Sequence, residues 1–196
     1  MRSLSDKAGL LIALNLFKYG IGFLLPVYLV RALTQEEYGT YQQLLLIGTT
    51  AAGLMSLGLP NSIYYYYNNV TVGKKRALIQ QTVAMLLVSA TIAALAVFYF
   101  SGDIAAVMSN PMLENVLPLY CVYILFFISG SYFIHLLISQ DRYSLAVMVE
   151  GGEAMVRAAI IVVPLFMGAG FTGLVVSIAA YAVIRLVVYS YIVKSD

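Results

Sequence analysis

Charged side chains are scarce in this sequence. Asp, Glu, Lys and Arg make up 10% of the 196 residues, 62% of the residues are hydrophobic, and the mean hydropathy is +0.90. An average soluble protein has about a quarter of its residues charged, so a soluble domain of this length is excluded. A bilayer offers backbone groups no water, and the apolar runs of about twenty residues therefore predict transmembrane helices and an all-α fold.

Cysteine and histidine are almost absent as well. Cys121 is the single cysteine and His135 the single histidine, so an intramolecular disulfide and a cysteine metal site are excluded. The sequence has no metal-ligand spacing, no phosphate-binding glycine loop and no nucleophile beside a base. We therefore expect that the protein is not an enzyme and binds no metal or cofactor. The sequence also has no charged tail, so we expect no nucleic-acid partner.

Six apolar segments are each long enough to cross a bilayer. They cover residues of about 8–33, 40–67, 77–101, 117–139, 143–167 and 171–193. The first begins like a signal peptide, but no small-residue cleavage site follows and its apolar character continues to Val30. We therefore predict one integral membrane lobe of six transmembrane helices, residues 1–196.

The charges between these segments fall on two sides of the membrane and differ in sign. One side carries a basic set: Arg2, Lys7, Lys74, Lys75, Arg76, Arg142 and Lys194. The other side carries a mainly acidic set: Arg31, Glu36, Glu37, Asp103 and Glu114. Lysine and arginine concentrate in cytoplasmic loops, so we predict that both termini are cytoplasmic.

The longest connection, residues 102–116, has two interpretations. Its apolar residues lie roughly on one helical face before Asn110 and Pro111 interrupt the run. This pattern is typical either of a short helix at the membrane surface or of an irregular loop.

Five ionisable residues fall inside the predicted spans, where an unpaired charge is costly and therefore marks a candidate functional site. They are Lys18, Glu150, Glu153, Arg157 and Arg185. Spacings of three and four place the two glutamates and Arg157 on one stripe of a helix, with Glu153 and Arg157 at ion-pair spacing. Arg185 lies at a depth similar to that of Glu150, which predicts an ion pair between helices with Glu150 or Glu153. Lys18 has no carboxylate near it in the sequence.

Two roles for these charges remain open. If they converge on one hydrated cavity, its slight positive charge favours a phosphate or another anionic group bound by Lys18, Arg157 and Arg185. Glu150 and Glu153 would then form ion pairs or couple transport to an ion. Alternatively, the five residues form buried pairs that only fix the packing of the helices.

Prolines inside or near the ends of three spans give a second signal. Pro26, Pro60 and Pro164 remove backbone hydrogen bonds and kink helices. Such breaks favour a bundle that changes shape.

Two short motifs carry a resemblance to a known family. The sequence LTQEEYGTY from Leu33 to Tyr41, followed by SLGLP at 56–60, resembles the polysaccharide-biosynthesis branch of the multidrug/oligosaccharidyl-lipid/polysaccharide transporter superfamily, the Wzx-type flippases. Their first helix typically ends in L-x-x-x-x-Y-G-x-Y, and their second ends in an L-G-L segment. Relatives have two six-helix lobes around a central cavity, so the resemblance implies that this chain is an amino-terminal lobe. Either it is part of a longer protein or two copies associate.

The resemblance also implies a function. It points to a flippase in the plasma (inner) membrane of a prokaryote that exports lipid-linked oligosaccharide, a polyprenyl-pyrophosphate-sugar, by alternating access for O-antigen or exopolysaccharide synthesis. Its partners would be this substrate, membrane lipids and a second lobe. The alternatives are a multidrug or cation exporter of the same superfamily, a membrane enzyme of the same pathway, and a non-transporting membrane component of polysaccharide assembly.

Overall fold

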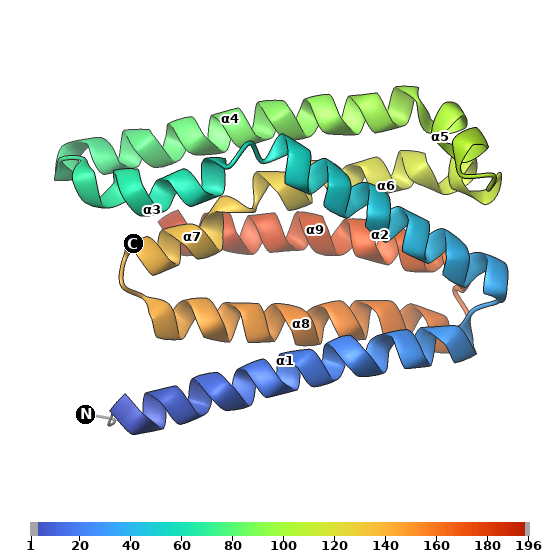
Figure 1. Ribbon diagram of the computed structural model, residues 1–196, viewed down its shortest axis with the longest axis horizontal. Helices are drawn as coiled ribbons and strands as arrows, with labels where there is room; N and C mark the ends of the chain where they lie inside the picture. Colours follow the sequence, from blue (N-terminus) through green and yellow to red (C-terminus); the bar gives the residue numbers. More distant parts are fainter. Residues whose placement is uncertain (1–3, 195–196) are drawn as a thin grey trace.

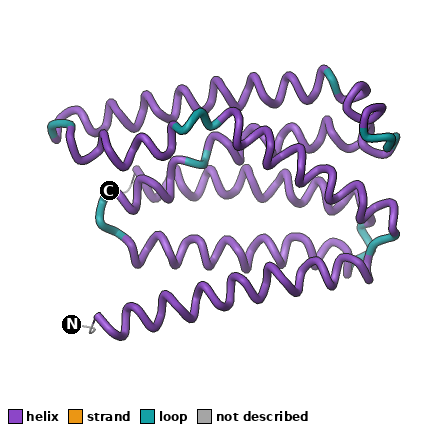
Figure 2. The backbone as a smooth tube through the Cα atoms, viewed as in Figure 1, coloured by secondary structure: helices purple, strands orange, loops and turns teal. Residues whose placement is uncertain are grey.

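Helices account for nearly all of the residues that the structure describes, and no strand occurs among them (Figures 1 and 2). This computed structural model describes residues 4–194, with side chains from residue 12 onward except those of 13, 14, 17, 72, 193 and 194. The predicted all-α class is confirmed. Arg2 and the side chains of Lys7 and Lys194, which contributed to the predicted basic side, lie outside the described part.

Nine helices follow one another in residues 4–194. They are α1 (Leu4–Ala32), α2 (Gln35–Met55), α3 (Leu59–Asn69), α4 (Val72–Tyr99), α5 (Ser101–Val107), α6 (Met112–Ser129), α7 (Tyr132–Ser139), α8 (Tyr143–Phe166) and α9 (Gly170–Lys194). The long helices run back and forth along one common direction, so the chain starts and finishes at the same end of the bundle (Figure 1). The connection predicted as either a surface helix or a loop contains α5, a helix of two turns.

The second helix starts earlier than predicted because its first turn is capped. Thr34 accepts a hydrogen bond from the backbone N–H of Glu37, and the Glu37 carboxylate accepts one from the Thr34 backbone N–H. This capping box satisfies two N–H groups that would otherwise lack partners. α2 therefore begins at Gln35, inside the LTQEEYGTY motif, rather than near residue 40.

Two of the predicted spans are each divided into two helices. Between α2 and α3, Leu57 and Gly58 adopt positive φ angles of 50° and 69°, and Pro60 lies in the first turn of α3. The SLGLP motif is thus a helix break, with proline where its missing N–H is tolerated. The segment predicted as one helix over 117–139 begins at Met112 and is interrupted at Gly130 and Ser131, between α6 and α7.

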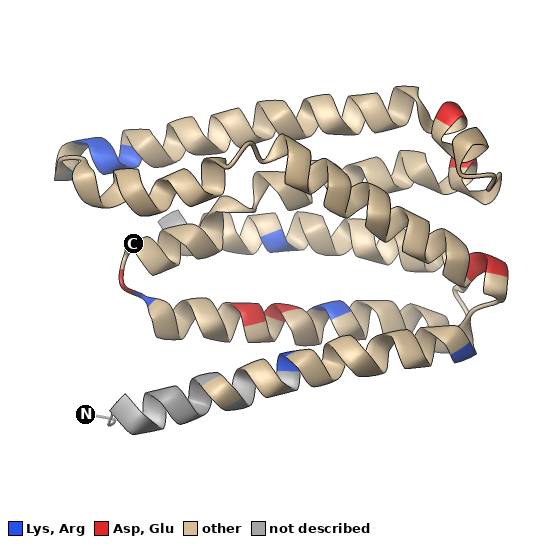
Figure 3. Cartoon of the chain, viewed as in Figure 1, with Lys and Arg blue, Asp and Glu red and all other residues tan. Residues whose placement is uncertain are grey.

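Charges concentrate at the two ends of the bundle (Figure 3). We call the end with the α3–α4 turn and the start of α8 the basic end, since it carries Lys74, Lys75 and Arg76. The opposite end holds the α1–α2 turn and α5, and we call it the acidic end. Its charged residues are Arg31, Glu36, Glu37, Asp103 and Glu114.

Four stretches of the described residues are long and apolar enough to cross a membrane. They are Gln35–Asn69, Gly73–Tyr99, Met112–Ser139 and Gly170–Ile192. α8 has the length but contains Glu150, Glu153 and Arg157 near its middle, so any stretch of about twenty residues in it carries all three charges. The chain is therefore a membrane protein, while the count of six spans and the cytoplasmic termini remain predictions.

The core is built around α6. This helix packs against α2, α4 and α9, and buries Leu113, Leu117 and Ile124 almost completely. α1 is placed differently, since it packs mainly against α8 and only slightly against α2. Residues of α1, α2 and α8 line a groove between these helices.

Candidate functional site

The first pair of charges inside the bundle joins α1 to α8. Lys18 Nζ lies 3.0 Å from Glu150 Oε2, and about two fifths of each side chain stays exposed, 42% and 39% respectively. The pair supplies the carboxylate that Lys18 lacks in its own part of the sequence. Because both groups remain accessible, an anion can compete with Glu150 for the ammonium group.

The second pair joins α8 to α9 and is much more enclosed. Arg185 Nε lies 2.5 Å from Glu153 Oε1, and only 9% of the arginine side chain is exposed. The guanidinium carbon lies 4.9 Å from the ring centroids of both Phe127 and Tyr189, a cation–π arrangement. One guanidinium nitrogen also donates to the Phe127 carbonyl at 3.4 Å, beside the α6–α7 break. The predicted ion pair between helices is therefore present with Glu153, and Arg185 is held by protein groups.

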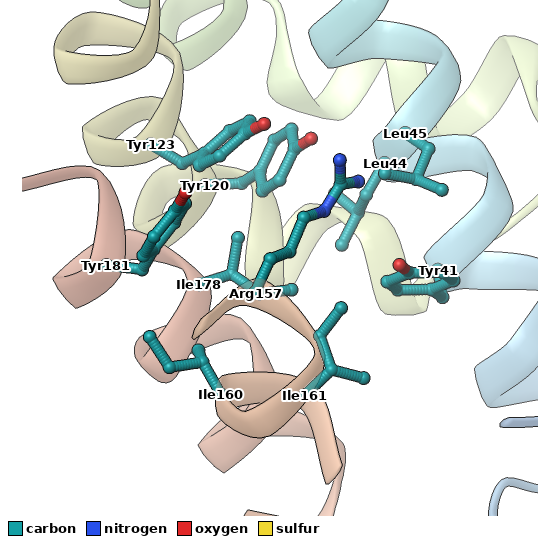
Figure 4. Close-up of a pocket in the computed structure, with 10 residues that line it drawn as sticks. All are labelled: Tyr41, Leu44, Leu45, Tyr120, Tyr123, Arg157, Ile160, Ile161, Ile178 and Tyr181. Atoms are coloured by element: carbon teal, nitrogen blue, oxygen red, sulfur yellow. The ribbon is translucent and has the colours of Figure 1, made fainter. Parts of the chain in front are cut away.

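Arg157 has neither of these carboxylates as a partner. Among the described residues no carboxylate oxygen lies within 4.0 Å of its guanidinium nitrogens, so the spacing of Glu153 and Arg157 does not produce an ion pair within α8. The side chain instead extends from α8 into a small cavity of about 20 Å³, room for about one water molecule (Figure 4). Four tyrosines line this tyrosine cavity: Tyr41, Tyr120, Tyr123 and Tyr181.

The tyrosine cavity shares lining residues with a larger space, which we call the cationic groove. The groove lies between α1, α2 and α8 and has a volume of about 580 Å³. Of the described residues that line it, Lys18 and Arg157 are charged, and both are basic. Three residues line both the groove and the cavity and so lie between the two: Tyr41, Leu45 and Arg157.

The structure brings together some of the predicted site residues and separates others. Lys18 and Arg157 line the same groove, with Glu150 beside Lys18. Arg185 and Glu153 do not line the groove; they are paired at the α8–α9 contact. Three basic residues were expected to share one cavity. Lys18 and Arg157 line the same groove, whereas Arg185 does not.

The tyrosines around Arg157 were not predicted as site residues. Tyr41 is the last residue of the LTQEEYGTY motif and is 4% exposed, so the motif itself reaches the site. The rings of Tyr120, Tyr123 and Phe127 stack at centroid distances of 4.9 and 5.0 Å. This stack extends along α6 from the tyrosine cavity to Arg185. The regular spacing of its aromatic residues along one face of α6 is the sequence pattern that could have predicted them as site residues.

Fold and site together define an all-helical membrane protein with a groove whose charged lining residues are basic among those described. The sequence model of the polysaccharide biosynthesis protein family matches residues 4–195. The chain belongs to this family, and the resemblance carried by LTQEEYGTY and SLGLP is confirmed. No curated protein and no solved structure matches the chain.

Proposed function

We propose that this chain is one lobe of a flippase that exports lipid-linked oligosaccharide for polysaccharide synthesis. The observation that carries the proposal is the cationic groove, in which Lys18 and Arg157 are the charged lining residues and Arg157 has no carboxylate partner among the described residues. An unpaired cation in an apolar layer is costly unless it meets water or an anionic ligand. Membership of the polysaccharide biosynthesis family supports a carbohydrate carrier as the cargo.

The pyrophosphate of a polyprenyl-pyrophosphate-sugar is the part of the cargo that this groove would bind. Arg157 offers a planar fork of N–H donors that suits two phosphate oxygens, and Lys18 adds a compact positive charge. The polyprenyl tail would stay in lipid beside α1, whose outward residues Leu16, Phe23 and Leu24 are exposed apolar side chains. No covalent step is required of any residue.

Glu150 provides a way to couple cargo binding to a counter-ion. An anion that binds Lys18 competes with the 3.0 Å contact to Glu150. The released carboxylate would then be free to bind a counter-ion, because it has lost its positive neighbour. Cargo and ion would thus bind to the same pair of side chains in turn.

Transport would proceed by alternating access in a bundle of six spans with both termini cytoplasmic. A second lobe, from a longer chain or a second copy, would cover the open side of the groove. The basic end would face the cytoplasm of a prokaryotic cell under the positive-inside rule, and the helix break formed by Leu57 and Gly58 gives α2 and α3 a point at which to bend.

Export of surface polysaccharide tests this proposal. In cells that depend on this protein, Arg157→Gln and Lys18→Gln should reduce export at normal membrane levels, with Arg31→Gln as the control that removes a cation outside the groove. Normal export in both groove variants would contradict the proposal.

A cation or drug exporter is the second candidate, and the groove argues against it. Such a transporter needs a net acidic lining, and no carboxylate lines the cationic groove among the described residues. A non-transporting assembly component would instead predict that loss of Arg157 changes folding and leaves flux per folded molecule unchanged.

A further inference from the structure

A second groove lies away from the cationic groove, on the other side of α2. It is lined by residues of α2, α4 and α5 and has a volume of about 570 Å³. Figure 1 shows where these three helices lie, with α5 at the acidic end. We call it the lateral groove. On α2 its lining extends from Leu46 to Met55, which corresponds to about 14 Å along the helix axis.

The shape of the lateral groove comes from small side chains between large ones. Ala51, Ala93 and Ala96 line it, and Ala93 is only 3% exposed, so it forms part of the floor. Leu46 and Leu54 line the same groove and are more than half exposed. A channel of this kind at membrane depth accepts a flexible hydrocarbon chain that lies along the helices.

Hydrocarbon alone cannot select one lipid, because lipid tails are as apolar as the groove. Selection needs a polar group, and Asp103 is the charged residue that lines the lateral groove. Among the described residues no cation lies within 4.0 Å of its carboxylate. Asp103 is also exposed, so it is accessible to a headgroup at the membrane surface.

The surroundings of Asp103 set the charge that such a headgroup must carry. Glu36, Glu37 and Glu114 lie at the same acidic end, together with the basic Arg31, so the net negative charge there disfavours an anionic headgroup. A primary ammonium donates charge-assisted hydrogen bonds to a carboxylate, whereas a quaternary ammonium has no N–H to donate. We propose that the lateral groove binds an acyl chain of a phospholipid whose headgroup ends in a primary ammonium that contacts Asp103.

The absence of tryptophan from the sequence allows a direct test. Leu54→Trp places a single fluorophore at the edge of the lateral groove, and Leu95→Trp places one on α4, 62% exposed and outside the groove lining. Each full-length variant is reconstituted in phosphatidylcholine vesicles with brominated phosphatidylethanolamine, phosphatidylcholine or phosphatidylglycerol. Bromine quenches a nearby indole, so the quenching gives the relative binding of each lipid.

The expected result is a preference of about two- to fivefold for phosphatidylethanolamine at Leu54→Trp, the range expected for one exposed ion pair. Leu95→Trp should show no preference. Adding Asp103→Asn should abolish the preference at Leu54→Trp, and Ala96→Phe, which fills the groove, should lower quenching by all three lipids.

Three results would overturn the proposal. Equal quenching by the three lipids at Leu54→Trp would show that no headgroup is selected. A preference that survives Asp103→Asn would assign the selection to another residue. No quenching by any brominated lipid would show that protein, such as a second lobe or a second copy, covers the groove. None of these readouts depends on flippase activity.

Discussion

Arg185 and Glu153 form an enclosed ion pair between α9 and α8, with 2.5 Å between Arg185 Nε and Glu153 Oε1. The guanidinium also lies against the rings of Phe127 and Tyr189 and donates to the Phe127 carbonyl. One side chain thereby connects α6, α8 and α9 where α6 ends. These contacts indicate that the pair holds the bundle together, in contrast to the accessible pair of Lys18 and Glu150.

Removal of Arg185 should therefore destabilise the fold. Arg185→Gln leaves the Glu153 carboxylate enclosed without a cation, and breaking a buried pair in this way costs about 3–5 kcal/mol. Unfolding of the purified full-length protein in mixed micelles measures this free energy. Glu153→Gln should also destabilise, and the double substitution should cost less than the sum of the two, because both remove the same interaction. An Arg185→Gln protein with wild-type stability but no export would instead place Arg185 among the residues that bind cargo.

Loss of the Lys18–Glu150 pair should have little effect on stability. Each side chain is about two fifths exposed, and an accessible pair contributes about 1 kcal/mol or less. Lys18→Gln and Glu150→Gln should thus unfold close to wild type in the same micelles, while Lys18→Gln lowers export. If Lys18→Gln unfolded as readily as Arg185→Gln, the pair would be structural and its role in coupling would be wrong.

Close packing of α2 on α6 gives a third prediction. A Cβ on Gly48 would meet the Tyr120 hydroxyl at a distance that real structures do not show, and two ring atoms of Tyr120 in tight contacts of 3.1 and 3.2 Å. Gly48→Ala should therefore cost about 1–3 kcal/mol of unfolding free energy through overpacking. Tyr120→Phe removes the nearest atom and should restore part of this loss in the double variant.

Gly53 provides the matched control for that experiment. It lies in the same helix, and a Cβ there would meet nothing within 4 Å. Gly53→Ala should raise stability by up to about 1 kcal/mol, because alanine loses less backbone entropy than glycine in a helix. Equal effects of the two substitutions would show that the Tyr120 contact does not limit the packing.

The sequence predicts the helical fold because membrane burial leaves few alternatives. Long apolar runs must satisfy their own backbone groups, so their helical form follows from composition. The boundaries were less accurate because they depend on local hydrogen bonds. The Thr34–Glu37 capping box starts α2 earlier than its apolar run does. The break between α6 and α7 at Gly130 and Ser131 contains no proline that would predict it from the sequence.

The candidate site was predictable only in part, for a related reason. Spacing along one helix places Glu150, Glu153 and Arg157 on a common stripe, but it cannot decide which partner each one meets across the bundle. Glu153 pairs with Arg185 and Glu150 with Lys18, which leaves Arg157 for the tyrosines. These pairings depend on how α1 and α9 pack against α8, and that packing is a property of the whole fold.

We expect Arg157 to bind the anionic cargo in the cationic groove. The most direct measurement is the amount of polysaccharide exported per folded molecule in cells carrying Arg157→Gln, Arg157→Lys or the control Arg31→Gln. We predict wild-type stability for all three variants. Arg157→Gln should lower export about tenfold or more, because it loses one charge-assisted phosphate contact. Arg157→Lys should lower export less, and Arg31→Gln should export normally. Normal export by stable Arg157→Gln protein would show that Arg157 does not bind the cargo.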